Sequence, residues 1–297
     1  MAKGISVHVG VSKVRAVGID VTDLKGCEKD AEAMYAIARD RGFVSDGLLL
    51  NEDAIFDRVT GAIRDAAGKL EDGDIFLFTF SGHGTRRGAE DITETDLKDE
   101  SIVLHDHILI DNVFRRSLWP LFKQGVRIVM VSDSCHSGTV FMTPSFMALA
   151  GPLTGTHASR PLSPQSRQIP SSDGDEVVST GGPLMRTISD SSARRHFSLA
   201  EDFYKDLRKK LPTGLAPEIK ASLLLLAPCE DDEQTPDGEP HGVFTQALLD
   251  VLNDDGSSNY NELIKGIRER LLDRPQHPVL ATAGHPPQFV EQGAFSI

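Results

Sequence analysis

The sequence predicts an α/β protein whose central sheet is mostly parallel and has helices on both faces. Apolar runs alternate with segments of helical period along the chain, which is typical of a parallel sheet. The runs at residues 74–80 and 126–131 are almost continuously apolar, as expected for strands that are covered on both faces. Each of these two runs then changes abruptly to small and polar residues, at the position where open α/β sheets hold their ligands.

The elements follow from periodicity, strand-like apolar runs and turn residues. The first part of the chain is predicted to form strands at residues 5–9, 47–50 and 74–80 and helices at 28–41 and 53–70. A polar stretch at 86–99 is predicted to be a loop at the rim of the site. The next part is predicted to form extended pieces at 102–104 and 108–110, a helix at 112–123 and the strand at 126–131.

The amino-acid composition changes at Val140. From there to Phe197, Ser, Thr, Pro and Gly dominate, and the apolar residues show no helical or strand periodicity. A stretch of this composition and length is predicted to be an irregular, flexible segment. Regular structure is expected again in helices at 199–211, 242–252 and 260–272 and in a strand at 219–227, before an irregular proline-rich tail from residue 274.

Composition limits the classes of function. The formal net charge of −13 argues against a nucleic-acid-binding protein with a broad basic face. The three cysteines form no CxxC pair and no disulfide framework, so a reducing, cytoplasmic setting is expected. We also expect no membrane attachment, because the sequence has no signal peptide and no apolar run long enough to cross a bilayer.

Two predicted strands end on residues that suit nucleophilic catalysis. His83 lies between two glycines after the strand at 74–80, and Cys135 follows the strand at 126–131. If the strands are neighbours, the imidazole can take the thiol proton and return it to a leaving amine. The amide groups of Gly84 and Cys135 could then hold an oxyanion. His136 is a weaker candidate for the base, because successive residues leaving a strand point apart.

These two motifs, residues 81–84 and 133–138, together resemble those of the metacaspases and their bacterial relatives the orthocaspases, which are caspase-like cysteine peptidases. Residues 24–31 and 242–245 resemble further segments of the same family. The resemblance implies one caspase-like domain overall, with a large-subunit-like catalytic part at 1–139, a flexible linker at 140–198 and a small-subunit-like part at 199–297.

The resemblance also implies an acidic pocket for an arginine or lysine before the scissile bond, lined here by Cys27, Asp30, Ser81 and Asp133. The pattern of the strands supports two of these residues independently. Ser81 and Asp133 each lie two positions before a candidate catalytic residue, so each faces the same side of its strand end. The alternative for Asp30 is a structural role as a charge at the start of a helix.

Many metacaspases resemble one another in a calcium-binding aspartate cluster, whose positions match Asp99, Asp111, Asn112 and Met142. A thioether is a poor ligand for calcium, so we expect no metal and no other cofactor. Under this expectation Asp99 is a solvated loop carboxylate and Asp111 caps a helix.

The sequence therefore predicts a cysteine endopeptidase that cuts protein substrates after Arg or Lys. Self-cleavage is expected after an arginine of the linker, the alternative being a flexible insert that is never cut; the candidates are Arg160, Arg167, Arg186, Arg194 and Arg195. By resemblance the protein is expected to be a monomer, with an upstream activator as a further expected partner.

Three other classes of protein are alternatives to the peptidase. The first is a non-catalytic caspase-like scaffold, or a zymogen that needs a partner. The second is a cysteine phosphatase, which would need an arginine soon after the nucleophile. The third is a zinc site made of His83, Cys135, His136 and Cys229, whose spacing matches no zinc pattern.

Overall fold

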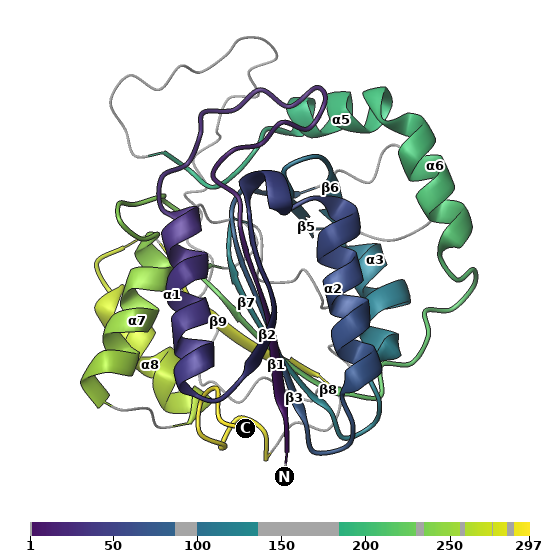
Figure 1. Ribbon diagram of the computed structural model, residues 1–297. Helices are drawn as coiled ribbons and strands as arrows, with labels where there is room; N and C mark the ends of the chain where they lie inside the picture. Colours follow the sequence, from purple (N-terminus) through teal and green to yellow (C-terminus); the bar gives the residue numbers. More distant parts are fainter. Residues whose placement is uncertain are drawn as a thin grey trace, which may run out of the picture.

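A six-stranded sheet forms the centre of the molecule (Figure 1). The computed structural model describes residues 2–86, 100–135, 184–229, 235–255, 259–274, 276–283 and 288–297. The strand order is β2-β1-β3-β7-β8-β9, and every neighbouring pair is parallel except β8 and β9. The strands are β1 (Gly4–Gly10), β2 (Val44–Leu50), β3 (Ile75–Ser81), β7 (Arg127–Asp133), β8 (Ser222–Ala227) and β9 (Val279–Ala283). The predicted class, a mostly parallel sheet flanked by helices, is confirmed.

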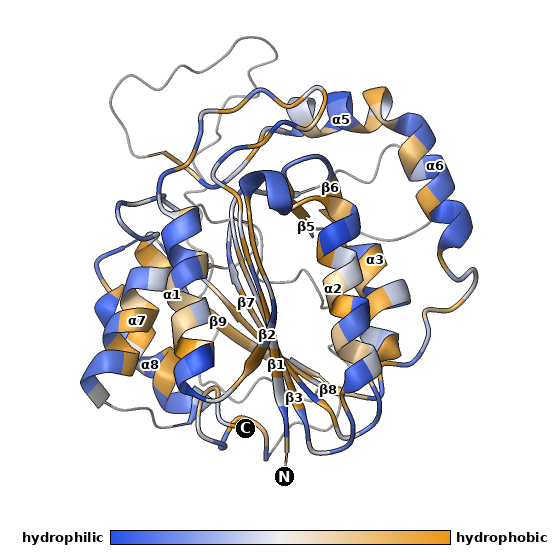
Figure 2. Ribbon diagram, viewed as in Figure 1, coloured by the Kyte–Doolittle hydropathy of each residue, from blue (hydrophilic) through white to orange (hydrophobic). Residues whose placement is uncertain are grey.

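Helices cover both faces of this sheet, and side chains of one strand alternate between the two layers. Phe76, Phe78 and Phe80 of β3 pack into one hydrophobic core, whereas Ile75 and Leu77 pack into the other. The first core lies under α2 (Phe56–Lys69), and the second lies under α1 (Cys27–Asp40), α7 (Val243–Asp255) and α8 (Tyr260–Arg270). The apolar sides of the helices accordingly face the sheet (Figure 2). This two-sided burial explains why the central strands lack alternation.

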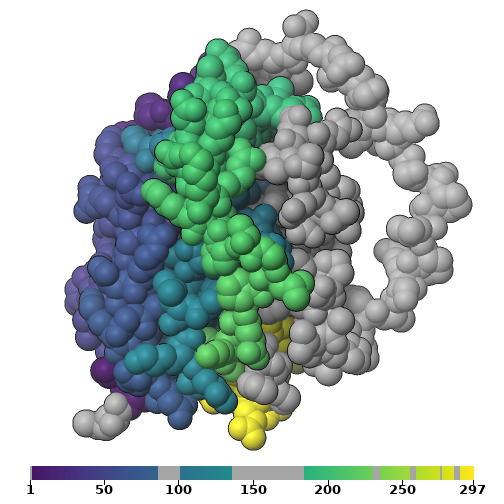
Figure 3. All heavy atoms as spheres, turned by 90° about the vertical axis from the view of Figure 1, so that its right-hand side faces the viewer, coloured from purple at the N-terminus to yellow at the C-terminus, as the bar shows by residue number. Residues whose placement is uncertain are grey.

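Two further helices, α5 (Asp190–Leu199) and α6 (Glu201–Lys210), run over the side of the molecule that carries α2 (Figure 3). Tyr204 of α6 fixes them there, because its hydroxyl donates to the Ile108 carbonyl at 2.9 Å and accepts from the Ile108 amide at 3.0 Å. His196 of α5 lies 2.9 Å from the same hydroxyl. Ile108 belongs to a small antiparallel sheet of β4 (Gly84–Arg86), β5 (Glu100–Val103) and β6 (Ile108–Ile110).

Three predicted elements differ from the structure. The helix expected at 112–123 is broken into the short turns α3 (Asp111–Val113), η3 (Phe114–Leu118) and η4 (Trp119–Leu121), because Pro120 cannot continue an α-helix. The irregular segment expected up to Phe197 ends earlier, since α5 begins at Asp190 with Ser189 as its N-cap. The tail expected to be irregular contains β9, which pairs with β8 at the sheet edge. The predicted loop at 86–99 lies almost wholly outside the described residues.

Candidate active site

The carboxyl ends of three neighbouring strands lie level with one another. Gly10 of β1 is the Cα partner of Ser81 of β3, which in turn is the partner of Asp133 of β7. His83 and Cys135 therefore follow two adjacent parallel strands at equivalent positions, as the sequence analysis assumed. Helix α1 follows β1 and brings Cys27 and Asp30 to the same edge.

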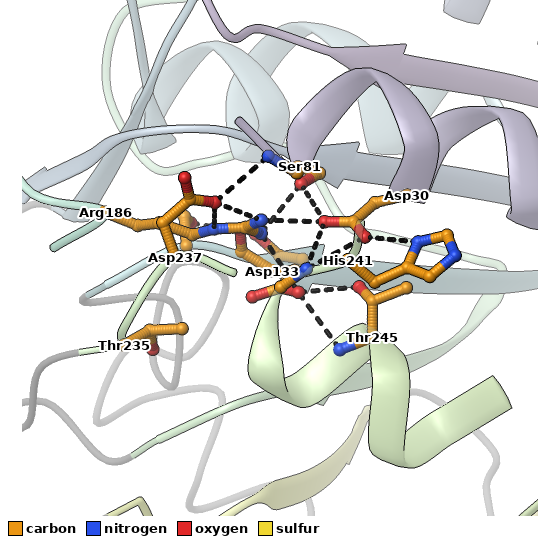
Figure 4. Close-up of polar contacts among 12 residues, drawn as sticks. Asp30, Ser81, Asp133, Arg186, Thr235, Asp237, His241 and Thr245 are labelled. Atoms are coloured by element: carbon orange, nitrogen blue, oxygen red, sulfur yellow. Dashed lines mark hydrogen bonds and ion pairs between the residues drawn. The ribbon is translucent and has the colours of Figure 1, made fainter. Parts of the chain in front are cut away.

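The guanidinium of Arg186 lies among the side chains at this edge (Figure 4). Its Nη2 lies 2.8 Å from Asp30 Oδ2, and its Nη1 lies 3.0 Å from Asp133 Oδ2. Nη1 also donates to the Ser81 hydroxyl at 2.7 Å. Arg186 is fully buried, although it is one of the largest side chains of the protein. Residues Asp30, Ser81 and Asp133 were all predicted to line such a pocket, and the structure brings them together around one arginine.

A third carboxylate was missed by the sequence analysis. Asp237 Oδ1 accepts from Arg186 Nη2 at 3.0 Å and from Nε at 3.3 Å, and its side chain is 2 % exposed. We call Asp30, Ser81, Asp133 and Asp237 the arginine pocket. Gly242 leaves room for the guanidinium, because a Cβ there would lie 2.5 Å from Arg186 Cζ. Cys27, also predicted here, is fully buried and electrostatically coupled to Arg186.

Neighbouring donors fix the two predicted carboxylates. Asp133 Oδ2 accepts from the backbone amide of Thr245 at 3.1 Å and from its hydroxyl at 2.6 Å. Asp30 Oδ1 accepts from the Gly242 amide at 3.1 Å and lies 3.0 Å from His241 Nδ1. The beginning of α7 thus supplies donors to both carboxylates. Asp30 presents its other oxygen, Oδ2, to the guanidinium, whereas Asp133 Oδ2 faces both Thr245 and Arg186.

Burial and the ion pairs have opposing effects on these charges. Burial would raise the pKa of Asp30, but Arg186, His241 and Ser81 outweigh it and lower this pKa. At Asp133 burial dominates and raises the pKa despite the attraction of Arg186. Burial also opposes the charge of Arg186, yet the surrounding carboxylates raise its pKa well above the usual value. The arginine therefore stays charged and compensates part of a cluster of buried acids.

The backbone bends at Arg186 and is hydrogen-bonded to two segments of the site. On one side, the Arg186 amide donates to the Thr235 carbonyl at 3.0 Å and the Asp237 amide donates to the Leu184 carbonyl at 2.7 Å. On the other side, the Ile188 amide donates to the Gly84 carbonyl at 3.1 Å. Isolated bridges between Met185 and Pro236 and between Thr187 and Gly84 thus hold the chain on both sides of Arg186.

The carbonyl oxygen of Arg186 accepts two backbone hydrogen bonds. The Gly84 amide donates at 2.9 Å and the Cys135 amide donates at 3.2 Å. These are the two amide groups that the sequence analysis chose as donors to an oxyanion. The carbonyl carbon of Arg186 therefore lies beside Cys135 while its side chain fills the arginine pocket.

Both candidate catalytic side chains are buried and favour their neutral forms in this arrangement. Burial raises the pKa of the Cys135 thiol to about 11, against the effect of hydrogen bonds from Thr235. Burial lowers the pKa of His83 to about 4, against the effect of the Thr22 carbonyl. His136 lies outside the described residues.

Among the described residues, no group of three or more His, Cys, Asp or Glu side chains could hold a metal ion. Of the positions that match a calcium cluster, Asp111 lies 3.5 Å from Arg115 Nη1 and Asn112 Oδ1 accepts from Arg116. Asp99 and Met142 lie outside the described residues. In the same part of the chain, every helix is too short or too polar to span a membrane.

Comparisons with known proteins identify the family of this chain. The family model of the caspase domain matches residues 4–286. The chain is 29 % identical over 290 residues to metacaspase-9 of Arabidopsis thaliana, covering 87 % of this chain and 88 % of that one. It is 23 % identical over 305 residues to metacaspase-1 of Mycosarcoma maydis, covering 93 % of this chain and 71 % of the relative.

Solved structures extend the comparison. The crystal structure of protein GSU0716 from Geobacter sulfurreducens superimposes with a TM-score of 0.76 at 32 % identity and covers 99 % of both chains. Caspase-1 from Spodoptera frugiperda superimposes with a TM-score of 0.51 at 12 % identity, covering 95 % of this chain and 86 % of that one, which shows a shared fold.

The protein is thus a cysteine-type peptidase with a caspase-like fold. The chain belongs to the caspase-domain family, and its relatives in that family include the metacaspases.

Proposed function

We propose that the protein is an endopeptidase that cuts protein substrates after arginine, and that it also cuts its own chain between Arg186 and Thr187. One observation carries the proposal: the side chain of Arg186 fills the arginine pocket while its carbonyl oxygen accepts from the Gly84 and Cys135 amides. A substrate residue before a scissile bond needs this combination of side-chain binding and carbonyl polarisation.

In the proposed reaction the sulfur of Cys135 attacks the carbonyl carbon of Arg186. His83 accepts the thiol proton and passes it to the nitrogen of Thr187, so that the Arg186–Thr187 bond breaks and a thioester to Cys135 remains. Water then hydrolyses this thioester, giving a carboxylate on Arg186 and the free thiol. The Gly84 and Cys135 amides stabilise the oxyanion of both steps.

The contacts of the guanidinium favour arginine over lysine. Nε, Nη1 and Nη2 of Arg186 all have acceptors in the arginine pocket. A lysine ammonium is a point charge and could not reach three carboxylates in this planar arrangement. We therefore expect lysine substrates to be cut more slowly than arginine substrates.

Intact-mass analysis of the purified full chain tests self-cleavage. We expect fragments that end at Arg186 and begin at Thr187, and a single uncut chain for Cys135→Ala. Arg186→Ala should remove this cut, whereas Arg194→Ala, a change at an exposed arginine of the following helix, should leave it. A cut that persists unchanged in Arg186→Ala would refute the proposed position.

Short fluorogenic peptides that end in Arg, Lys or Asp test the specificity towards other substrates. We expect release after Arg, weaker release after Lys and none after Asp, with all release lost in Cys135→Ala and His83→Ala. Release after Asp, or equal release after Arg and Lys, would contradict the role proposed for the carboxylates.

The buried position of Arg186 also favours a zymogen state of the uncut chain. While Arg186 fills the arginine pocket, no substrate arginine can enter it. Activity on peptides should then rise in step with the cut after Arg186. Full activity of the chain before any cut would rule out this state.

We further propose that the reaction needs no calcium. The carboxylate of Asp111 pairs with Arg115, and the side-chain oxygen of Asn112 is bonded by Arg116. Peptide cleavage should stay within about twofold when a chelator replaces millimolar calcium. A loss of activity with chelator that calcium restores would contradict this.

A further inference from the structure

Thr235 touches both the candidate nucleophile and the residue in the arginine pocket. Its backbone amide donates to Cys135 Sγ at 2.9 Å, and its carbonyl accepts from the Arg186 amide at 3.0 Å. The same carbonyl lies 3.6 Å from Cys135 Sγ, within reach of the thiol proton. Thr235 is fully buried, so these contacts are shielded from water.

The side chain of Thr235 continues this network. Its hydroxyl lies 3.3 Å from Cys229 Sγ. Burial raises the pKa of the Cys135 thiol, and the Thr235 side chain opposes this rise as a donor. A hydroxyl can accept one hydrogen bond while it donates another. The Cys229 thiol can therefore donate to the Thr235 hydroxyl while that hydroxyl donates to the Cys135 sulfur.

A thiolate at Cys135 would face groups of both signs. Asp133 disfavours the negative sulfur, and Arg186 favours it. Arg186 belongs to the segment that is proposed to be cut, so its charge is replaced by that of each new substrate. His83 carries a proton only after it has taken one from the thiol. Thr235 is thus a permanent donor to the sulfur that does not depend on the bound arginine.

We propose that Thr235 is a further catalytic residue, which stabilises the Cys135 thiolate by donating from its amide and its hydroxyl. No bond of Thr235 is made or broken, and the thiol proton leaves for His83. The backbone amide of the residue before the cut donates to the Thr235 carbonyl, which makes this carbonyl a weaker acceptor for the thiol proton. The sulfur then accepts hydrogen bonds from the Thr235 amide and hydroxyl. Binding of the substrate backbone and activation of the nucleophile are therefore coupled through one residue. This inference rests on the proposed function.

The thiolate of Cys135 can be titrated by its ultraviolet absorbance, as the difference between each protein and its Cys135→Ala form. Arg186→Ala in every protein keeps the chain uncut for this measurement. Thr235→Val removes the hydroxyl at nearly constant side-chain volume. We expect this change to raise the midpoint of the Cys135 titration by about one pH unit. Thr235→Ser, which keeps a hydroxyl, should titrate like the parent. Thr60→Val is the matched control, because Thr60 is a buried threonine whose hydroxyl donates to the Phe56 carbonyl in α2.

Peptide cleavage gives a second readout on the chain that retains Arg186. Thr235→Val should lower kcat about tenfold and leave KM nearly unchanged, since the hydroxyl stabilises the attacking sulfur rather than the bound peptide. Superimposable titrations of Thr235→Val and its parent, or an equal shift in Thr60→Val, would overturn the inference. A shifted titration in a protein that cuts no arginine peptide would support the role of Thr235 and refute the proposed cleavage after arginine. Should Thr235→Val fail to fold, Thr235→Ala provides the same comparison.

Discussion

The carbonyl oxygen of Arg186 lies 2.9 Å from the amide nitrogen of Gly84, and the Gly84 carbonyl in turn accepts from Ile188. One glycine therefore holds the chain on both sides of the Arg186–Thr187 bond. A peptide bond clamped at both ends cannot rotate away from the neighbouring sulfur, which is the positional requirement for attack.

Gly84→Ala should impair catalysis. A Cβ at this position would overlap the carbonyl of Cys135 and displace one of the two amides that bond the Arg186 carbonyl. We expect kcat for an arginine peptide to fall by about 10²- to 10³-fold, the cost of one oxyanion donor. Gly61→Ala is the control, because a Cβ on Gly61 meets nothing within 4 Å. A kcat near that of the parent would contradict the role of the Gly84 amide.

Asp237→Asn should weaken arginine selection. The change can keep the oxygen that accepts from the Lys25 amide, but it removes the charge that pairs with Nε and Nη2 of Arg186. We expect a loss of about 1.5–3 kcal/mol in kcat/KM for arginine peptides, and a smaller loss for lysine peptides. Glu239→Gln, at an exposed carboxylate on the same segment, is the matched control. An unchanged ratio of arginine to lysine cleavage would count against Asp237 as part of the specificity.

Gly242→Ala should close the arginine pocket. Its Cβ would lie 2.5 Å from Arg186 Cζ, which is too close for a guanidinium with no room to move. We expect KM for arginine peptides to rise at least about tenfold while the unfolding midpoint stays near that of the parent. Gly68→Ala, where a Cβ meets nothing within 4 Å, should change neither quantity. Normal arginine cleavage by Gly242→Ala would show that the guanidinium binds elsewhere.

His8 should make the fold sensitive to acid. Burial lowers its pKa to about 3, far below the value near 6.5 of an unfolded chain. Between these values the unfolded state binds a proton that the folded state does not. The stability that the neutral His8 contributes is therefore fully present above pH 6.5. As the pH decreases from 6.5 towards 3, the free energy of unfolding falls by about 1.4 kcal/mol per pH unit because of this residue.

Denaturant unfolding at several pH values measures this slope. The side chain of His8→Asn can still bond to the Thr79 hydroxyl. In this variant the free energy of unfolding should depend less steeply on pH, by the amount that one proton contributes. His277→Asn, at an exposed histidine, should keep the full slope. Equal slopes for the parent and His8→Asn would mean that His8 is protonated in the folded protein.

The sequence contains enough information to locate much of this site. Ser81 and Asp133 could be placed together because each ends a continuous apolar run, and parallel strands end at the same edge of a sheet. Asp30 and Cys27 were predicted by resemblance alone, since nothing in the period of α1 indicates that its first turn approaches β3.

Asp237, Thr235 and the choice of Arg186 could not be predicted in the same way. Asp237 follows a run of acidic residues that has no period and reads as a solvated loop. Arg186 was one of five arginines in an irregular stretch, and only its position in the folded chain distinguishes it from Arg194, which is exposed on α5. By contrast, the break in the helix expected at 112–123 could have been predicted, because Pro120 cannot continue an α-helix.

The place of the proposed cut within the sheet has a mechanical consequence. Strand β7 precedes Arg186 and β8 follows it, and the two pair along Arg127 to Val131. Cleavage after Arg186 would thus divide the polypeptide but not the hydrogen-bonded sheet, whose strands on either side of the cut would remain in register. Two bands would appear on a denaturing gel, while a sedimentation experiment in native buffer would find one particle of undiminished mass.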